Sequence, residues 1–462
     1  MKNFKHNNFK LFITICLFLI LNPFVTGQQE FILDKAYKDK LLYSISDLIE
    51  TKYVIPEAAQ KSAEDFRNKI SSGCYDSIND AIIFTEKVTN DLINITNDKH
   101  IHFRLIESSD LSEEPECSLH HPIRYHRLGL KENNGFSKLE WLEGNIGLFE
   151  LTRFYNYSDV KDMVLNAMHF LSNADAIIID IRENGGGSGD YLSSYFLKYP
   201  TQLNSSYSRI DNYLTESWTL KDIGMEPMTD IPLFILTSDK TFSAAESFAY
   251  NMKAMNRAII IGDSTKGGAH SVDLYNLYDQ FEIYIPTARA INPVTRENWE
   301  GIGVIPDVNI GAAVALDTAI VLAKKLAIEY AKVKEEKLKS AVQEMQFYLE
   351  QTELLISDKK IKEANKSLES LLQVGKEFRI VNEFFFHVWA YHYSSIGEEQ
   401  MLYAILDKYI EYYPNSIIPY EKYIYAYNKF GKKERALKYV YKTLDIEPDN
   451  QYALKMITRL QD

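Results

Sequence analysis

The apolar positions between residues 31 and 95 recur every three or four residues. One helical face carries the following residues: Leu41, Leu42, Ile45, Leu48 and Ile49. A second stretch with the same spacing covers 78–92. This period predicts helices with one buried face, and we interpret the region as a supporting helical bundle.

From residue 141 onward, short apolar runs alternate with helical stretches. Strands are predicted at 141–151, 176–181, 233–237, 258–262 and 280–286, and helices at 158–172, 191–197 and 244–255. Strands that alternate with helices in this way indicate an α/β fold with a central sheet. A last helix of this region is expected over 313–330.

The last part of the chain carries a regular repeat. The following pairs are all separated by the same interval: Gly397 and Gly431, Leu402 and Ala436, Ile410 and Leu444, Pro414 and Pro448. The interval is the tetratricopeptide period, and with less regular helices over 333–374 it predicts an all-α solenoid. An aromatic-rich stripe is expected in the solenoid core: Phe384, Phe385, Phe386, Trp389, Tyr391 and Tyr393. The solenoid either binds a peptide or protein partner or covers the end of the preceding domain.

The segment 1–27 has the pattern of a signal peptide: three lysines, an apolar run over 11–21 and small residues at 25–27. A membrane anchor is the competing interpretation, but the run is shorter than the roughly 20 residues of a spanning helix. We therefore expect export to the periplasm or the outside of the cell, with no membrane span after cleavage. The predicted domains are 1–27 (signal), 28–140 (helical region), 141–330 (core) and 331–462 (repeats).

Composition excludes some functions. The chain has 462 residues and a net charge of −13, with no clustered basic surface of the kind that nucleic acid requires. Its histidines are scattered and no Cys-x-x-Cys or His-Glu-x-x-His pattern occurs, so we expect no metal and no cofactor. Outside the signal the chain has two cysteines, Cys74 and Cys117, which could form one disulfide in an oxidising compartment.

Ser243 lies between the predicted strand 233–237 and the helix that begins at Ala244. A serine at such a turn is held in place, and the helix N-terminus offers N–H groups to an oxyanion. This arrangement suits acyl transfer. The alternative is a structural role, in which Ser243 caps the helix and Glu246 completes a capping box.

Three consecutive glycines, 185–187, follow the predicted strand at 176–181. Glycines at such a place let the backbone approach a ligand with its N–H groups converging. Together with Ser243 they suggest a nucleophile and an oxyanion hole, although a plain Gly-rich turn is the structural alternative. A phosphate site is disfavoured because the Gly-Lys-Ser/Thr and Gly-x-Gly-x-x-Gly patterns are absent.

Five motifs, in this order, resemble those of the carboxyl-terminal processing (tail-specific) serine peptidases: Asp98-Lys99-His100, 180–187, 241–246, 262–270 and 299–307. The branch with the tricorn core protease and the interphotoreceptor retinoid-binding protein repeats is the more similar one. The resemblance covers about 31–312 and implies a crotonase/ClpP-like ββα spiral core. The segment between Leu105 and Ile146 is too short for a PDZ domain of typical size, so none is expected.

The resemblance also implies site residues. The better-known members use a lysine further along the chain than the serine, but Gly268 stands at the matching position here. The tricorn branch instead uses a histidine and a glutamate, which correspond to His100 and Glu300, although its serine before the histidine is replaced by Lys99. Other candidates for the base or a substrate contact are the following: His270, Lys266 and His102.

The resemblance favours an exported serine endopeptidase that acts on peptides or unfolded protein tails through an acyl-enzyme on Ser243. The matching oxyanion donors are the N–H of Ala244 and one from Gly186 or Gly187. The alternative function is a non-catalytic protein that holds an apolar ligand or a protein partner in the same cleft. A third possibility makes the repeats the functional part and the core a scaffold.

Overall fold

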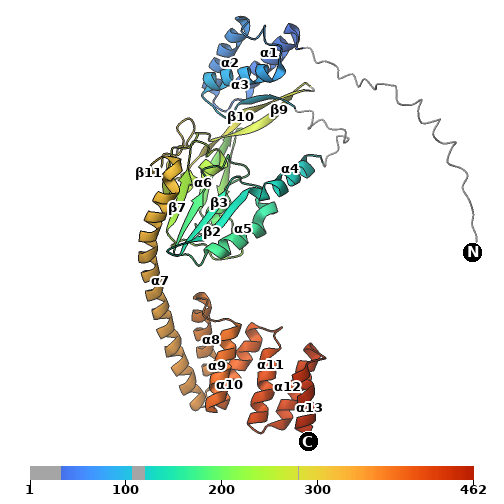
Figure 1. The fold of residues 1–462 in the computed structure, drawn as a ribbon, viewed down its shortest axis with the longest axis vertical. Helices are drawn as coiled ribbons and strands as arrows, with labels where there is room; N and C mark the ends of the chain where they lie inside the picture. Colours follow the sequence, from blue (N-terminus) through green and yellow to red (C-terminus); the bar gives the residue numbers. More distant parts are fainter. Residues whose placement is uncertain (1–32, 107–119, 279, 462) are drawn as a thin grey trace, which may run out of the picture. The chain divides into compact units, whose positions relative to one another are not determined.

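The computed structural model describes residues 33–106, 120–278 and 280–461 (Figure 1). It divides into two compact units, one ending at Ala327 and the other beginning at Ile328. Each unit has a hydrophobic core of its own. The predicted signal at 1–27 and Cys117 lie outside the described residues, and Cys74 is an exposed thiol.

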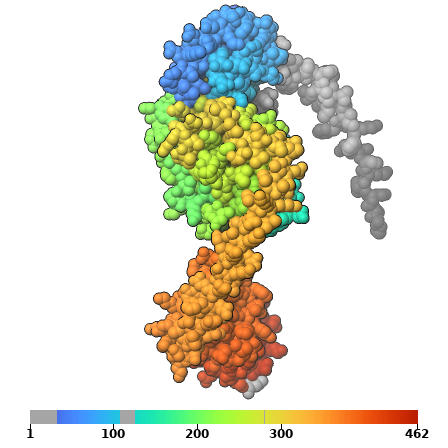
Figure 2. Space-filling view, turned by 90° about the vertical axis from the view of Figure 1, so that its left-hand side faces the viewer, coloured from blue at the N-terminus to red at the C-terminus, as the bar shows by residue number. Residues whose placement is uncertain are grey.

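Three helices begin the first unit: α1 (Lys35–Lys52), α2 (Pro56–Ser71) and α3 (Ala81–Thr96). The carboxylates of Asp34 and Asp80 accept hydrogen bonds from backbone N–H groups in the first turns of α1 and α3. These N-caps satisfy donors that the start of a helix leaves free. The buried face of the helices packs against Phe281, Ile283 and Ile285 of a strand. Figure 2 shows the helices, in blue, seated on the yellow part of the same unit.

A six-stranded sheet forms the centre of the first unit, in the order β11-β8-β7-β4-β3-β2. Its strands are β2 (Phe136–Leu142), β3 (Ile146–Leu151), β4 (Ala176–Asp180), β7 (Leu233–Thr237), β8 (Ile259–Gly262) and β11 (Val308–Asn309). All neighbours are parallel except β2 and β3. β4 and β7 are buried throughout, as expected for apolar strands of a covered parallel sheet. The predicted α/β class is confirmed.

A second sheet was not anticipated from the sequence. It contains β1 (His102–Leu105), β5 (Gln202–Ser208), β6 (Tyr213–Trp218), β9 (His270–Leu277) and β10 (Phe281–Ile291), with the path β1-β10-β5-β6 and β9 also paired to β10. β5 and β6 are rich in serine and threonine, and every side chain of β6 is exposed. Strands without an apolar face give no period-2 hydrophobic signal, which is why the pattern missed them.

Helices and short turns connect the strands of the two sheets: α4 (His120–Lys131), η1 (Asn133–Gly135), α5 (Tyr157–Leu171), η2 (Leu192–Tyr195) and α6 (Ala244–Ala254). α5 and α6 each join two strands of the six-stranded sheet. The helix predicted over 191–197 is therefore only a 3₁₀ turn, η2. α6 begins where β7 leaves the six-stranded sheet. This β7–α6 connection carries Ser243.

The second unit is helical: α7 (Ala312–Ser357), α8 (Ile361–Glu377), α9 (Glu383–Ile396), α10 (Glu399–Tyr412), α11 (Ile418–Lys429), α12 (Lys433–Ile446) and α13 (Gln451–Gln461), with α7 beginning in the first unit. The expected break between a helix ending at 330 and new helices from 333 is wrong, because α7 runs on unbroken. No Gly or Pro interrupts 312–357, so the backbone can continue in one helix.

The sequence repeat falls on equivalent places in two helix pairs. Gly397 and Gly431 have positive φ angles of 84° and 72° after α9 and α11, where a left-handed residue ends a helix. Leu402 and Ala436 are buried in α10 and α12. The assignment to tetratricopeptide repeats stays a prediction.

The aromatic stripe on α9 divides between two environments. Phe386 and Tyr393 are buried in the core, as expected, but Phe384 is 72% and Tyr391 66% exposed. A helix carries only one side of its circumference into a core, so adjacent aromatic residues cannot all be buried. Within the described residues, no helix is both long enough and apolar enough to span a membrane.

Candidate functional site

Ser243 lies in a strained turn. Its φ of 54° and ψ of −117° are unusual for a residue with a side chain. Two hydrogen bonds fix the turn: the Thr241 hydroxyl donates to the Ile181 carbonyl over 2.9 Å, and the Phe242 N–H donates to the Asn184 carbonyl over 3.0 Å. Strain that the surroundings hold in place is typical of functional sites.

Glu246 holds this turn through its buried side chain. The carboxylate accepts hydrogen bonds from the N–H groups of Ser243 (2.9 Å), Gly267 (2.6 Å) and Gly268 (2.8 Å) and from the Thr265 hydroxyl. Burial raises the pKa of Glu246, and these donors oppose the rise. From the sequence, Glu246 is expected only as the capping-box partner of Ser243. The additional donors come from a distant part of the chain, where no local pattern could have revealed them.

The glycine loop packs directly on the Ser243 turn. A methyl group at Gly186 would lie 2.8 Å from the Ser243 Cβ and 2.8 Å from the Phe242 carbonyl oxygen, and Gly186 has a φ of +99°. Glycine is therefore required at this position. The Gly186 N–H, however, donates to Asn184 Oδ1 over 2.9 Å. The Gly186 N–H is thus engaged within the loop, which favours the other glycine that the sequence offered as an oxyanion donor, Gly187.

The N–H groups of Gly187 and Ala244 remain as donors. Both residues line the same cleft as Ser243. In the part of the chain that the structure describes, neither N–H has a hydrogen-bond acceptor. Gly187 carries its own constraint, since any side chain there would collide with the Phe154 carbonyl.

His100 packs beside the Ser243 turn. Its ring packs against that of Phe242, with 4.4 Å between the ring centroids and 31° between the ring planes, and the side chain is 9% exposed. Both ring nitrogens are buried and make no hydrogen bond among the described residues, and Nδ1 lies 3.7 Å from the Asp98 Oδ1. A Cβ at Gly268 would come within 2.5 Å of the His100 Cε1. The space beside Gly268 is therefore occupied by the imidazole of His100.

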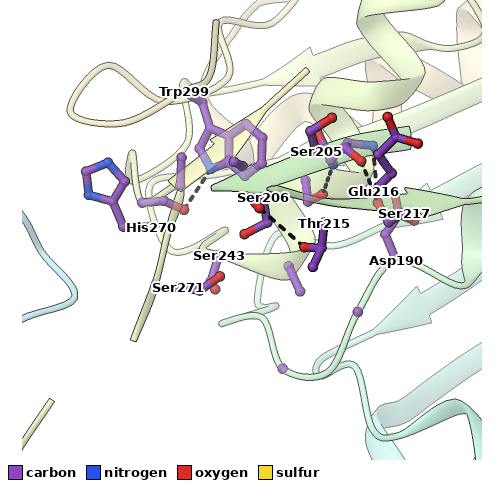
Figure 3. Close-up of a pocket in the computed structure, with 18 residues that line it drawn as sticks. Asp190, Ser205, Ser206, Thr215, Glu216, Ser217, Ser243, His270, Ser271 and Trp299 are labelled. Atoms are coloured by element: carbon purple, nitrogen blue, oxygen red, sulfur yellow. Dashed lines mark hydrogen bonds between the residues drawn. The ribbon is translucent and has the colours of Figure 1, made fainter. Parts of the chain in front are cut away.

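His270 is the better-bonded histidine. Its Nδ1 lies 2.6 Å from the Asp98 Oδ2, and the two side chains are 2% and 1% exposed. The Tyr53 hydroxyl also donates to Asp98, over 3.2 Å. In Figure 3 the His270 ring points away from Ser243. Asp98 belongs to a motif seen in the sequence, but its role as the partner of a histidine far along the chain was missed.

Glu300 completes this cluster. Its Oε2 accepts hydrogen bonds from the N–H groups of Ala269 (2.6 Å) and His270 (3.2 Å), and its Oε1 is buried without a partner among the described residues. Burial, and then the charge of Asp98, raise the pKa of Glu300. Burial alone would also raise the pKa of Asp98, but hydrogen bonding to His100 and His270 lowers it below its usual range. Asp98 is therefore the more acidic of the two carboxyl groups.

Asp98, His270 and Glu300 bring their ligand atoms within 4.8 Å of one another, close enough to be compared with a metal site. The contacts of the two carboxylates are instead hydrogen bonds: Glu300 Oε2 accepts two backbone N–H groups and Asp98 Oδ1 accepts the His100 backbone N–H. Glu300 Oε1 has no such donor among the described residues. The expectation of no metal stays a prediction.

The other two candidate bases lie outside the cluster. Lys266 is exposed, and its ammonium lies over the Phe242 ring, 4.7 Å from the centroid. His102 is exposed on β1, paired with Tyr284 of β10. His100 precedes β1, so the two histidines do not share a strand face as the sequence allowed.

Many polar side chains line the cleft (Figure 3). It has a volume of about 290 Å³ and is lined on one side by Ser243, Ala244 and Ser247 and on the other by residues of β5 and β6. The remaining polar side chains of the wall are as follows: Asn204, Ser205, Ser206, Thr215, Glu216, Ser217, Asp190, His270 and Ser271. Such a wall offers hydrogen-bonding groups beside the apolar surface of Ala269, Ala290 and Trp299.

Two family models match the chain. Residues 145–310 match peptidase family S41, and residues 33–134 match the N-terminal domain of peptidase S41 in eukaryotic IRBP. Together the two matches cover more than half of the 462 residues.

Curated relatives match over shorter stretches. A carboxyl-terminal-processing protease of Picosynechococcus sp. is 24% identical over 201 residues, which are 42% of this chain and 46% of that protein. A tail-specific protease of Haemophilus influenzae is 32% identical over 130 residues, 27% of this chain and 17% of that protein. The chain thus matches less than half the length of either relative. Among solved structures, the photosystem II D1 C-terminal processing protease is 16% identical, with a TM-score of 0.37, over 60% of this chain and 94% of that one.

Proposed function

Since the chain belongs to peptidase family S41, we propose that it is a serine peptidase that cleaves peptide bonds through an acyl-enzyme on Ser243. The observation that carries this proposal is the strained Ser243 turn, which faces the same cleft as the N–H groups of Gly187 and Ala244, neither of which has an acceptor among the described residues. A structural cap would need neither the strain nor the adjoining donors.

The proposed reaction follows from this geometry. Ser243 Oγ attacks the carbonyl carbon of the scissile bond and passes its proton to a base. The carbonyl oxygen becomes negative and accepts hydrogen bonds from Gly187 and Ala244. Collapse of this intermediate expels the amine, which takes the proton back from the base, and water then releases the acyl group in the reverse manner.

We assign the base to His100. Its ring fills the space beside Gly268, which is the position of the lysine in the better-known members, and a side chain at 268 would collide with it. Neither nitrogen makes a hydrogen bond in the described chain, and Nδ1 lies 3.7 Å from the Asp98 carboxylate, so the other nitrogen, Nε2, is available for the serine proton. His270 is the weaker candidate, because its Nδ1 is committed to Asp98 and its ring points away from Ser243.

Glu300 and the Asp98–His270 pair have supporting roles in this proposal. Glu300 Oε1 is the buried, unpartnered carboxylate oxygen of the cluster, and the charge of His100 acts on its pKa. It can stabilise the imidazolium that forms when His100 accepts a proton. Asp98 positions the segment that carries His100, because it accepts the His100 backbone N–H and is itself held by its contact with His270.

The cleft wall favours a peptide over an apolar ligand. Small hydroxyl and amide side chains line it, and Asn204 Oδ1 is buried there without a partner among the described residues. Burying apolar surface against such groups would leave them unsatisfied, whereas a peptide backbone can pair with them. These polar groups favour a peptide over a wholly apolar ligand.

Export remains part of the proposal and rests on the sequence of residues 1–27. Peptides or unfolded protein tails are the proposed substrates, as the names of the tail-specific and carboxyl-terminal-processing relatives suggest. The spiral form of the core and the lack of a PDZ domain also remain predictions from the resemblance.

A fluorophosphonate probe tests the central claim. We expect covalent labelling of the native protein at Ser243, found by mass spectrometry, and no labelling of Ser243→Ala. A folded Ser243→Ala variant that still hydrolyses an unfolded protein substrate would contradict the proposal. Labelling without hydrolysis of any peptide would favour the binding alternative.

A further inference from the structure

The second unit contains a groove that is separate from the cleft of Ser243. Its volume is about 530 Å³. Its wall is made of one face of α9, one face of α11 and the start of α13: His387, Tyr391, Ser394, Ser395, Ile418, Glu421, Lys422, Tyr425, Lys429 and Tyr452. The spacing of three or four residues along α9 and α11 shows that each helix contributes a single face.

The groove is basic, although the chain carries a net charge of −13. Its charged side chains are Lys422, Lys429 and Glu421. Glu421 is engaged with Asn450, whose amide donates to it over 2.9 Å. Lys429 donates to the Ser394 carbonyl, which does not neutralise its charge. Two ammonium groups therefore face one carboxylate in this wall.

Lys422 is the informative residue. It is half-buried, yet among the described residues no carboxylate or carbonyl lies within hydrogen-bonding distance of its Nζ. Burial lowers the pKa of Lys422. Burial also lowers the pKa of His387, and the charge of Lys422 lowers it further. A half-buried ammonium without an acceptor is costly, and a carboxylate from outside would remove that cost.

The two lysines also define a spacing. They lie seven residues apart on α11 and therefore on the same face, about 10 Å apart along the helix axis. In an extended segment with polyproline II geometry, which has three residues per turn, side chains three residues apart lie on the same face and are separated by a similar distance, about 9 Å. The exposed rings of Tyr391 (66%) and Tyr425 (51%) are available for the residues between them.

We infer that this groove binds an extended polypeptide segment that carries two acidic side chains three positions apart, with Lys422 and Lys429 as their partners. This goes beyond the chemistry at Ser243 and does not depend on it. A peptidase with this groove would bind a substrate chain at a second site, distinct from the cleft of Ser243.

The test measures binding by fluorescence anisotropy with the full chain carrying Ser243→Ala, so that turnover has no influence. The probe is a fluorescein-labelled, C-terminally amidated dodecapeptide with two glutamates three positions apart. We expect it to bind, and its counterpart with two glutamines to bind at least tenfold more weakly. The glutamine peptide with a free C-terminus should be equally weak; if it binds as well as the glutamate peptide, the ligand is a chain terminus and the inference is wrong.

Matched variants locate the site. Lys422→Gln should weaken binding of the glutamate peptide about tenfold, the size of one charge-assisted contact. Lys422→Arg should retain it. Lys438→Gln removes an exposed charge of α12 outside the groove and should leave it unchanged. Three outcomes would each overturn the inference. The first is an equal loss of affinity for Lys422→Gln and Lys438→Gln, and the second is no loss of affinity for Lys422→Gln with an unchanged melting curve. The third is no binding of the glutamate peptide to the chain with Lys422 intact.

Discussion

The two sides of the cleft around Ser243 are built differently. On the serine side, the turn at 241–246 and the glycine loop are tied by hydrogen bonds between Thr241 and Ile181, Phe242 and Asn184, and Gly186 and Asn184. On the histidine side, the buried nitrogens of His100 and the Oε1 of Glu300 have no partner among the described residues. The serine turn is thus fixed by hydrogen bonds, whereas the ring of His100 is held by packing against Phe242 and Gly268.

This difference separates two tasks of the site. The nucleophile and the oxyanion donors must be in place before substrate arrives, and backbone hydrogen bonds provide that at little cost. A base must instead keep a nitrogen free to accept a proton, so it is held through its ring, here against Phe242 and Gly268. Changes at the free groups should therefore affect the reaction more than the fold.

The largest effect is expected for the nucleophile. Ser243→Ala should lower peptidase turnover by a factor on the order of 10⁴ or more, because the covalent step is lost. The melting temperature should change little, since a helix cap contributes only about 1 kcal/mol. Parallel rate and calorimetric measurements check this. A large fall in melting temperature with a small fall in rate would return Ser243 to a structural role.

The two histidines should respond in opposite ways. His100→Ala should lower turnover by about 10²–10⁴, the range of general acid–base catalysis, with a small effect on stability. His270→Ala leaves Asp98 buried without its partner and should cost about 3 kcal/mol of stability. Turnover and thermal unfolding of both variants measure the contrast. If His270→Ala stays stable and loses all turnover, the base has been assigned to the wrong histidine.

Packing on the histidine side gives a smaller effect. Gly268→Ala pushes a methyl group into the rings of His100 and Phe242 and should lower turnover about 10²-fold, as expected for a displaced catalytic group. Gly185→Ala is the matched control, because nothing lies within 4 Å of its Cβ position. Equal rates for the two variants, measured on one peptide, would show that the position of His100 does not matter.

The contrast between the two sides also explains what the sequence could predict. The serine side is local in sequence: β7, the turn and α6 follow one another, and the apolar run and the helical period place Ser243 between them. The glycine loop is similarly recognisable after β4. Even so, only the structure shows that the Gly186 N–H is used by Asn184 and leaves Gly187 as the donor.

The histidine side depends on contacts distant in sequence. His270 meets Asp98 from a different region of the chain. On the serine side, Glu246 likewise accepts from Gly267 and Gly268, which lie well beyond the end of its own helix. No periodicity reports such pairings. The polar strands β5 and β6 were missed for a related reason: they form one wall of the cleft and bury too little apolar surface to leave a pattern.

The smallest effect is expected in acid. The pKa of Asp98 lies below its ordinary value of about 3.9 because contacts with His100 and His270 outweigh burial. Its ionised form therefore adds stability that is fully present above about pH 4 and is lost as the pH falls toward the folded-state pKa. Asp98→Asn lacks this contribution. The gap in melting temperature between the native protein and Asp98→Asn should be widest near pH 6 and narrow between about pH 4 and pH 2.

Glu300→Gln supplies the control of opposite sign. Burial, and then the charge of Asp98, raise the pKa of Glu300, so its ionised form costs stability at neutral pH and the cost disappears as the pH falls through that raised value. Relative to the native protein, Glu300→Gln should gain most in melting temperature at neutral pH and lose that gain in acid. Gaps that stay constant with pH for both variants would mean that neither carboxyl group has a shifted pKa. The histidine side would then differ from the serine side only in its packing.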